Sequence, residues 1–450
     1  MEWCVSMPKI ELHAHLNGSI RDSTLLELTK ALIGKGVMNF SEVEHIILKY
    51  NRSLKEVFKL FDLIHILTTD HNTVTRITRE VIEDFASENV VYLELRTTPK
   101  KNDSVGMSKH SYVEAVLKGL RSITSVDVDF IPHCEDSKTL FTPAPVINGH
   151  VRKKIFVRLL LSIDRRETTE AAMETVKLAL EMRPYGVVGI DLSGNPSIGD
   201  WTTYLPALKF AREQGLYVTL HCGELPNSKE IKNMLDFRPQ RIGHACFFED
   251  EHWRQLKSSN IPVEICLTSN VRTMTVPSID VHHFAHLYNA KHPLALCTDD
   301  SGVFSTCLSK EYKIAADSFG LGRREMFELS RNAVEHIFAD SKVKEDLRKI
   351  FNSVAKKYGS VTTLTIMLGI APYPSLKLVI ESFTCKKKNV YNSNVVLIII
   401  LYPCKWSLME ITQSSDYSSG RFRLMNHTAY AIAMVNGHVI GYMLTSGNLG

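Results

Sequence analysis

The segment YVTLHCGELPNSKEIKNMLDFRPQRIGH, residues 217–244, contains one complete repeating unit of the predicted fold. It begins with the apolar run Tyr217–Leu220, continues through the amphipathic stretch Ser228–Leu235 and reaches a second apolar run at Arg241–Gly243. Two short apolar runs joined by a helical stretch predict parallel strands that are covered by the connecting helix. A histidine follows each run directly, so polar side chains are expected where the strands end.

The same alternation continues in both directions along the chain. Six further apolar runs are predicted as strands: Ile10–His13, Val90–Leu95, Phe156–Ile163, Val187–Leu192, Val263–Cys266 and Leu294–Cys297. Apolar residues recur at helical spacing between them, for example in Leu54–Leu67, Arg76–Phe85 and Thr168–Glu181. Eight strand–helix units predict an α/β fold, a (β/α)8 TIM barrel whose active site lies at the carboxyl ends of the strands.

Two parts of the chain depart from this alternation. Residues 131–154 contain three prolines and no clear periodicity, so they are predicted to be an atypical insertion before the third strand. The barrel is expected to span residues 8–357, and residues 358–450 form a C-terminal extension of unknown role. Within that extension, Asn436-Gly437 stands between two apolar runs and predicts a β-hairpin.

Composition narrows the class of protein. The 450 residues are 44% hydrophobic and carry a formal charge of only +4, with basic residues scattered, so no nucleic-acid partner is expected. The nine cysteines are an odd number without a C-x-x-C pair, and several fall within or beside predicted strands as small buried hydrophobes, which fits a reducing compartment. The N-terminus lacks a signal-peptide core, and the most apolar stretch, Val395–Tyr402, is far shorter than the about 20 residues of a membrane helix. We therefore expect a soluble, cytoplasmic monomer without membrane contact.

Four residues at predicted strand ends have the side chains of a metal site. His13 and His15 are two apart, so on a strand both point to one face. His221 follows the fifth strand and Asp299 follows the eighth, so all four meet at the same end of the barrel. Three imidazoles and a carboxylate suit zinc, with iron, manganese and cobalt as alternatives. We expect one Zn²⁺ per chain, and zinc lowers the pKa of bound water to about 7.

Three further residues are candidates for acid–base chemistry. His244 is placed to orient or deprotonate water, although a structural histidine beside the metal would look the same. Glu224 can donate a proton to a substrate, or it can simply occupy a helix N-terminus. Asp300 follows a metal ligand and must point elsewhere, either toward the substrate or toward a ligand histidine.

These motifs together resemble those of the adenosine and AMP deaminase family. The resemblance covers about residues 8–357 and rests on H-A-H-L-N-G-S, D-L-S-G, H-C-G-E, R-I-G-H, C-L-T-S-N and C-T-D-D, in this order. It implies that Glu224 protonates the purine N1, that His244 and Asp300 handle the attacking water and contact the purine, and that Gly194 offers a backbone N–H. The zinc ligands that it implies are His13, His15, His221 and Asp299.

The resemblance also implies a purine-nucleotide pocket and a substrate class. The implied pocket residues are His15, Asn17, His65, Thr97, Thr98, Pro99, Lys100, Asp164, Gly194 and Asp300. The run L-R-T-T-P-K-K places Arg96, Lys100 and Lys101 near the barrel mouth, which favours a monophosphate over a free nucleoside. The implied reaction is hydrolytic deamination at purine C6, converting N6-methyl-AMP to IMP and methylamine.

Two alternatives stay open at this point, and two others are disfavoured. The chain can be a deaminase of the free nucleoside adenosine, or a purine-nucleotide-binding barrel whose insertion has abolished catalysis by displacing the third strand and Asp164. A two-metal barrel hydrolase would need a lysine at the end of the fourth strand, and Ile190–Gly194 contains none. The H-x-E…P-C-x-x-C signature of cytidine-type zinc deaminases is absent from the sequence.

Overall fold

The computed structural model describes residues 1–33, 54–131 and 153–359, together with five strands of the C-terminal segment. The insertion predicted at about 131–154 therefore lies outside the described residues except at its two ends. The chain divides into two compact units, residues 1–351 and 352–450.

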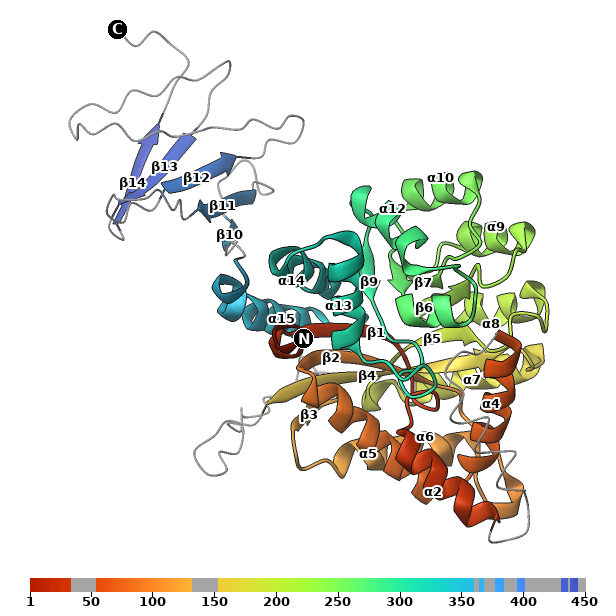
Figure 1. Ribbon diagram of the computed structural model, residues 1–450. Coiled ribbons are helices and arrows are strands. Elements are labelled where there is room, and N and C mark those ends of the chain that lie inside the picture. Colours follow the sequence, from red (N-terminus) through yellow and green to blue (C-terminus); the bar gives the residue numbers. More distant parts are fainter. Residues whose placement is uncertain are drawn as a thin grey trace, which may run out of the picture. The chain divides into compact units, whose positions relative to one another are not determined.

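Eight parallel strands form the barrel of the first unit (Figure 1). In barrel order they are β1 (Lys9–His15), β2 (Val90–Thr97), β4 (Lys154–Asp164), β5 (Val187–Ser193), β6 (Tyr217–Cys222), β7 (Arg241–His244), β8 (Val263–Ile265) and β9 (Leu294–Leu296). The ring closes just beyond β9, where Ala14 and Asp299 form a parallel bridge. These strands coincide with the eight predicted runs, and the predicted TIM-barrel fold is confirmed.

One strand was not predicted. β3 (Asp127–Asp129) pairs in parallel with β4 and lies outside the barrel order. Its three residues carry two aspartates, so it lacks the apolar run that marks the other strands. β4 keeps its position between β2 and β5, and Asp164 is its last residue. The insertion therefore does not displace the third barrel strand.

Helices cover the outside of the barrel (Figure 1). Those that precede β5 are α1 (Glu2–Ser6), α2 (Asp22–Ile33), α4 (Leu54–Leu67), α5 (His71–Ser87), α6 (Lys109–Arg121) and α7 (Thr169–Glu181). Those that follow it are α8 (Trp201–Glu213), α9 (Ser228–Phe237), α10 (Asp250–Ser259), α11 (Leu267–Arg272), α12 (Phe284–Asn289), α13 (Leu308–Phe319), α14 (Arg323–Asn332) and α15 (Ser341–Val354). Short 3-10 turns lie at Asp103–Val105, Arg183–Tyr185, Ile279–Val281, Ala333–His336 and Ala355–Tyr358.

Local sequence explains where several helices begin. Asp70 caps α5 by accepting hydrogen bonds from the backbone of Asn72 and Thr73, and Thr168 caps α7 in the same way through Ala171.

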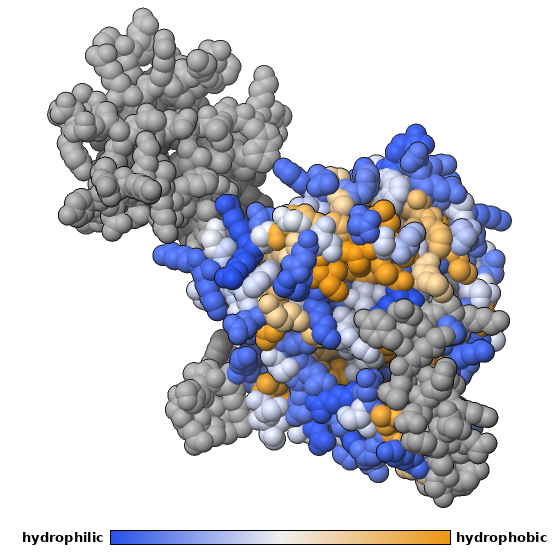
Figure 2. Space-filling view, in the orientation of Figure 1, coloured by the Kyte–Doolittle hydropathy of each residue, from blue (hydrophilic) through white to orange (hydrophobic). Residues whose placement is uncertain are grey.

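All eight residues of β2 are buried, because the strand is covered on both faces. In the view of Figure 2, hydrophilic side chains surround several apolar patches on the outer surface of the barrel unit.

The second unit contains five described strands. β10 (Leu364–Met367), β11 (Lys377–Phe383) and β12 (Val395–Ile400) form an antiparallel sheet. β13 (Tyr430–Val435) and β14 (His438–Met443) pair antiparallel on either side of residues 436–437, so the predicted hairpin is confirmed. Among the described residues of the whole chain, no helix combines the length and apolarity needed to cross a bilayer.

Candidate active site

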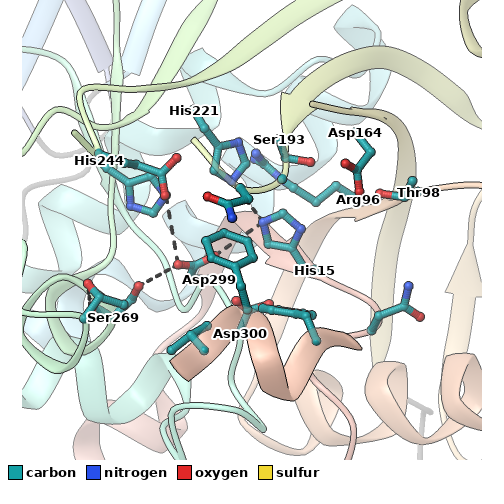
Figure 3. A pocket seen from close by; sticks show the side chains of 18 of the residues that line it. His15, Arg96, Thr98, Asp164, Ser193, His221, His244, Ser269, Asp299 and Asp300 are labelled. Carbon is teal, nitrogen blue, oxygen red and sulfur yellow. Dashed lines mark hydrogen bonds and ion pairs between the residues drawn. The ribbon is translucent and has the colours of Figure 1, made fainter. Parts of the chain in front are cut away.

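Four ligand-type side chains meet at the carboxyl end of the barrel, and three of them, His15, His221 and Asp299, are labelled in Figure 3. His221 Nε2 lies 3.1 Å from both His13 Nε2 and His15 Nε2. Asp299 Oδ1 lies 3.4 Å from the same two nitrogens of β1. A tetrahedral site with bonds of 2.0–2.1 Å has edges of about 3.3 Å, so this donor set fits one zinc ion. All four ligand atoms lie within 4.8 Å of one another, as expected from their predicted strand ends.

Buried carboxylates orient two of the histidines. Glu264 Oε2 accepts a hydrogen bond of 2.6 Å from His13 Nδ1, and both side chains are inaccessible to solvent. His221 Nδ1 lies 3.0 Å from Asp191 Oδ1 and 3.0 Å from the carbonyl of Leu192. These contacts hold a proton on Nδ1 and leave each Nε2 lone pair free for a metal. Neither carboxylate was predicted, although Glu264 is visible as a charged residue within an apolar run.

Arg96 joins the two supporting carboxylates. Its guanidinium donates to Asp191 Oδ1 at 3.0 Å, to Glu264 Oε2 at 2.8 Å and to the Leu12 carbonyl at 2.6 Å. The side chain is fully buried. Arg96 was predicted near the barrel mouth and does line the cavity there, but its guanidinium is bound to these buried groups. Its position on β2 points it toward the barrel axis, where two buried anions require a cation.

Asp299 is held in an unusual backbone conformation. Its φ is +64°, in the left-handed region that residues other than glycine seldom adopt. Its backbone bonds to β1 on either side of Ala14 in the sequence, since its N–H donates to His13 O at 2.7 Å and its carbonyl accepts from His15 N at 3.0 Å. Ser269 donates to Asp299 Oδ2 at 2.6 Å, which leaves Oδ1 toward the histidines. Burial alone would raise the pKa of Asp299, but the surrounding histidines, His13 first among them, hold that pKa well below its usual range.

His244 and Glu224 lie beside this ligand set. His244 Nε2 is 3.7 Å from Glu224 Oε1 and 4.0 Å from Asp299 Oδ2, and its Nδ1 contacts Asn270 Nδ2 at 3.0 Å. Burial holds the pKa of His244 well below its usual range, so the ring is neutral. Burial raises the pKa of Glu224, which favours a protonated carboxyl and suits a proton donor.

Asp300, the residue after the ligand Asp299, also lines the cavity. Burial, together with the charge of Asp299, raises the pKa of Asp300 well above its usual range. Among the described residues, Asp300 Oδ1 has no hydrogen-bond partner. A Cβ on Gly18 would lie only 1.6 Å from that oxygen, so glycine is required there to admit the carboxyl group. A buried, uncharged carboxyl with a free oxygen is ready to bind a polar atom of a ligand.

One part of the wall of a cavity of about 230 Å³ is formed by residues of this centre, namely His15, His221, Glu224, His244, Asp299 and Asp300 (Figure 3). Other walls come from β2, β4, β5, α4 and the segment after α11. Residues of the cavity wall that were not predicted include Val57, Phe58, Phe61, Asp62, Arg166, Ser193, Asn195, Ile198, Ser269, Asn270, Thr273, Thr275 and Phe304.

Most of the predicted pocket residues line this cavity, and two do not. His15, Asn17, His65, Thr97, Thr98, Asp164, Gly194 and Asp300 are all part of its wall. Pro99 and Lys100 are absent from the wall; Lys100 Nζ instead donates to Thr68 Oγ1 at 2.5 Å. The hydroxyl of Thr97 is bonded to Tyr112 at 2.8 Å, which leaves Thr98 with the freer hydroxyl. Lys101 is 64% exposed and pairs with Asp103, so it does not join the cavity.

Another part of the cavity wall holds the cation Arg166 together with the carboxylates of Asp62 and Asp164. Arg166 NH2 lies 3.0 Å from His65 Nε2 and 2.8 Å from Asp164 Oδ2. Burial, together with the charges of Lys100 and Arg166, lowers the pKa of His65 to about 3. Arg166 follows β4 in the run I-D-R-R, but the sequence did not show which arginine faces the cavity. Arg165 is instead buried against Glu230.

A closed ring of parallel strands with a zinc-type donor set and a buried acid at its carboxyl end defines a metal-dependent hydrolase barrel. The chain belongs to the adenosine deaminase family, whose model, described as "Adenosine deaminase", matches residues 8–356. It is therefore a purine deaminase, a hydrolase that releases an amine.

Comparison with known proteins gives close relatives. The chain is 67% identical to the N6-mAMP deaminase of Arabidopsis thaliana over 358 residues, which cover 80% of this chain and 100% of that protein. It is 39% identical to the human N6-methyl-AMP deaminase, with coverage of 77% and 93%. An Arabidopsis relative solved in complex with IMP shares 66% identity and a TM-score of 0.74, covering 80% of this chain and 100% of that structure.

Proposed function

We propose that the chain hydrolyses N6-methyl-AMP to IMP and methylamine at a single zinc centre. The observation that carries this proposal is the cavity itself, which has acid and metal-ligand groups in one part of its wall and Arg166 with His65 in another. The relatives named for N6-methyl-AMP deamination, and the relative solved with IMP, support the same substrate class.

The part of the wall with Arg166 and His65 suits a 5′-phosphate. Arg166 lines the cavity and is 48% exposed, so a nucleotide can reach its guanidinium. His65 and Thr98 line the same region, and Lys100 adds charge from behind the wall. Charge-assisted hydrogen bonds from such groups bind phosphate oxygens strongly. A free nucleoside has no phosphate for Arg166, whose guanidinium then has only the carboxylates of Asp164 and Asp62 as anionic partners.

The part of the wall with the acid and metal-ligand groups suits attack at the purine carbon C6. Glu224 is buried with a raised pKa, so it can hold the proton that N1 requires. Asp300 has an uncharged carboxyl with a free oxygen, which suits a hydrogen bond to the purine ring. Gly194 has a φ of +97°, and a Cβ there would come within 3.0 Å of both Arg165 N and Asp164 Oδ1, so glycine brings its backbone close to the cavity.

His13, His15, His221 and Asp299 would hold the zinc ion. When bound, it supplies Lewis acidity that lowers the pKa of water to about 7. The buried carboxylates Glu264 and Asp191 keep two of the imidazoles in the tautomer that a metal needs.

A substrate panel tests this proposal directly. AMP, N6-methyl-AMP, adenosine and N6-methyladenosine are compared on the purified full chain, with the change in purine absorbance as the readout. We expect the highest kcat/KM for N6-methyl-AMP. A preference for either free nucleoside, or no turnover of any of the four by zinc-loaded protein, would contradict the proposal.

A further inference from the structure

We propose that Asn270 and His282 are positioning residues that fix the tautomer of His244, so that its Nε2–H donates a hydrogen bond into the active site. This inference rests on the proposed function for its chemical meaning, but the tautomer itself is a property of the substrate-free protein. The sequence left open whether His244 orients the attacking water or deprotonates it. An Nε2 that carries a hydrogen can orient and stabilise an oxygen but cannot remove a proton, so this tautomer selects the first role.

The direction of the chain of hydrogen bonds is set at its far end by a backbone group. The N–H of Phe284 donates to His282 Nδ1 at 3.0 Å, and a backbone N–H can only donate. His282 is buried, and burial lowers its pKa to about 2, so its ring is neutral. A neutral imidazole that accepts at Nδ1 must carry its hydrogen on Nε2.

The remaining links follow from this hydrogen. His282 Nε2 lies 3.2 Å from Asn270 Oδ1, which therefore accepts. The amide nitrogen of Asn270 then faces His244 Nδ1 at 3.0 Å and donates to it. His244 accepts at Nδ1, so in its neutral form the hydrogen is on Nε2. Each donor in the series has one acceptor, and no link can be reversed without breaking the bond to Phe284.

The protein also holds the main chain at both ends of this series. His283, next to His282, donates from Nε2 to the carbonyl of His244 at 2.6 Å, where the backbone has a φ of +67°. The carbonyl of Asn270 accepts from the backbone of Thr275 and Val276, each at 3.0 Å. The segment 282–284 thus fixes His244 through its side chain and its backbone, which is more than packing alone requires.

The Nε2–H of His244 is left without an acceptor in the described protein. The nearest oxygens are those of Glu224 and Asp299, at 3.7 and 4.0 Å, and neither is a hydrogen-bond partner. A buried donor without a partner is costly unless a ligand satisfies it. The oxygen that adds to the purine C6 is such an acceptor, and stabilising charge that develops on it is a strong source of catalysis. The proton of the attacking water then goes to Glu224, which is a carboxylate once it has given its own proton to the purine N1.

Long-range ¹⁵N–¹H spectra of histidine-labelled, zinc-loaded protein without substrate test the tautomer. The signals of His244 are those that disappear in His244→Gln. We expect the pattern of an Nε2–H imidazole in the wild type. In Asn270→Asp the carboxylate can only accept, so we expect the hydrogen of His244 to move to Nδ1. The pattern of an Nδ1–H imidazole in the wild type, or an unchanged pattern in Asn270→Asp, would overturn the proposal.

Kinetics give the second readout. Asn270→Asp replaces one amide nitrogen by oxygen and keeps the shape of the side chain, so we expect the zinc content to be unchanged. We expect kcat to fall by at least about a hundredfold, because a wrong histidine tautomer lowers kcat strongly in other hydrolases. The control is Asn289→Asp on the exposed end of α12, which should leave kcat unchanged. If Asn270→Asp is unstable, the spectrum of the wild-type protein still shows which nitrogen of His244 carries the hydrogen. If the substrate panel contradicts the proposed function, the substrate assignment changes. The tautomer of His244 is measured on the substrate-free protein, so its test does not depend on the substrate panel.

Discussion

Arg166 and Asp164 form a three-bond ion pair within two residues of the chain. The backbone N–H and Nε of Arg166 donate to Asp164 Oδ1 at 2.8 and 3.0 Å, and NH2 donates to Oδ2 at 2.8 Å. The pair fixes the guanidinium at the cavity wall beside His65. A planar group held in this way is already oriented for a phosphate, so little side-chain entropy is lost on binding.

The first prediction concerns this phosphate preference. We expect kcat/KM for N6-methyl-AMP to exceed that for N6-methyladenosine by at least about a hundredfold, a difference of about 2.8 kcal/mol. Arg166→Ala and Lys100→Ala should each narrow the ratio, mainly by raising KM of the nucleotide. Arg183→Ala is the control, because Arg183 bonds to the Gln214 carbonyl and does not line the cavity. A wild type that prefers the nucleoside would show the phosphate assignment to be wrong.

The second prediction is a pH dependence of nucleotide binding. Burial, with the charge of Arg166, lowers the pKa of Lys100 to about 7. Lys100 is therefore charged below that pH and becomes neutral above it, so KM for the nucleotide should rise between about pH 7 and pH 9, where the phosphate stays a dianion. Lys100→Arg keeps its charge throughout this range, and its KM should stay flat. The same rise in wild type and Lys100→Arg would exclude Lys100 as its source.

The third prediction is one zinc ion per chain. His221→Ala removes one of the four ligands, so metal content and activity should fall together. His110→Ala is the control, because this histidine is 43% exposed and pairs with glutamates outside the cavity. A second possible group, His244 with Cys266 and Asp299, shares Asp299 with the first and cannot fill independently. Two ions per chain in metal analysis of the native protein would count against a mononuclear centre.

The fourth prediction concerns the acid. Glu224→Gln keeps the size of the side chain but cannot hold the proton, so turnover should fall by about a hundredfold or more while zinc content is unchanged. Glu230→Gln makes the same chemical change on α9, where Glu230 pairs with Arg165 outside the cavity, and should retain most activity. Near-normal turnover in Glu224→Gln would assign this residue a structural role.

The sequence predicted the parts of the site that follow from strand periodicity and strand ends. His13 and His15 are two apart on one strand, and the carboxyl ends of the strands meet, so the sequence alone predicted the ligand set. Contacts between side chains of strands that are distant in the sequence could not be predicted in this way. Glu264 bonds to His13 from β8, which is separated from β1 by β9, and no local pattern encodes that pairing. Likewise Arg165 and Arg166 are equivalent in the sequence, and only the turn after β4 sends one to Glu230 and the other to the cavity.

The last prediction is that the C-terminal extension is dispensable for the chemistry. All barrel strands and all residues proposed for the site precede residue 301, and the Arabidopsis relative is matched over its full length by 80% of this chain. A chain ending at Ser360 should bind one zinc ion and keep kcat/KM within about threefold of the full-length value, a change of less than about 0.7 kcal/mol.

A shorter chain supplies the matched comparison for this truncation. Ending at Asp340 also removes α15, whose Val343, Leu347 and Phe351 are fully buried. Each such side chain contributes about 1.5–3 kcal/mol, so this shorter chain should lose stability, with a lower unfolding temperature or no soluble product. If the chain ending at Ser360 is soluble and zinc-loaded but inactive, the extension contributes to the site and the boundary proposed near residue 357 is wrong.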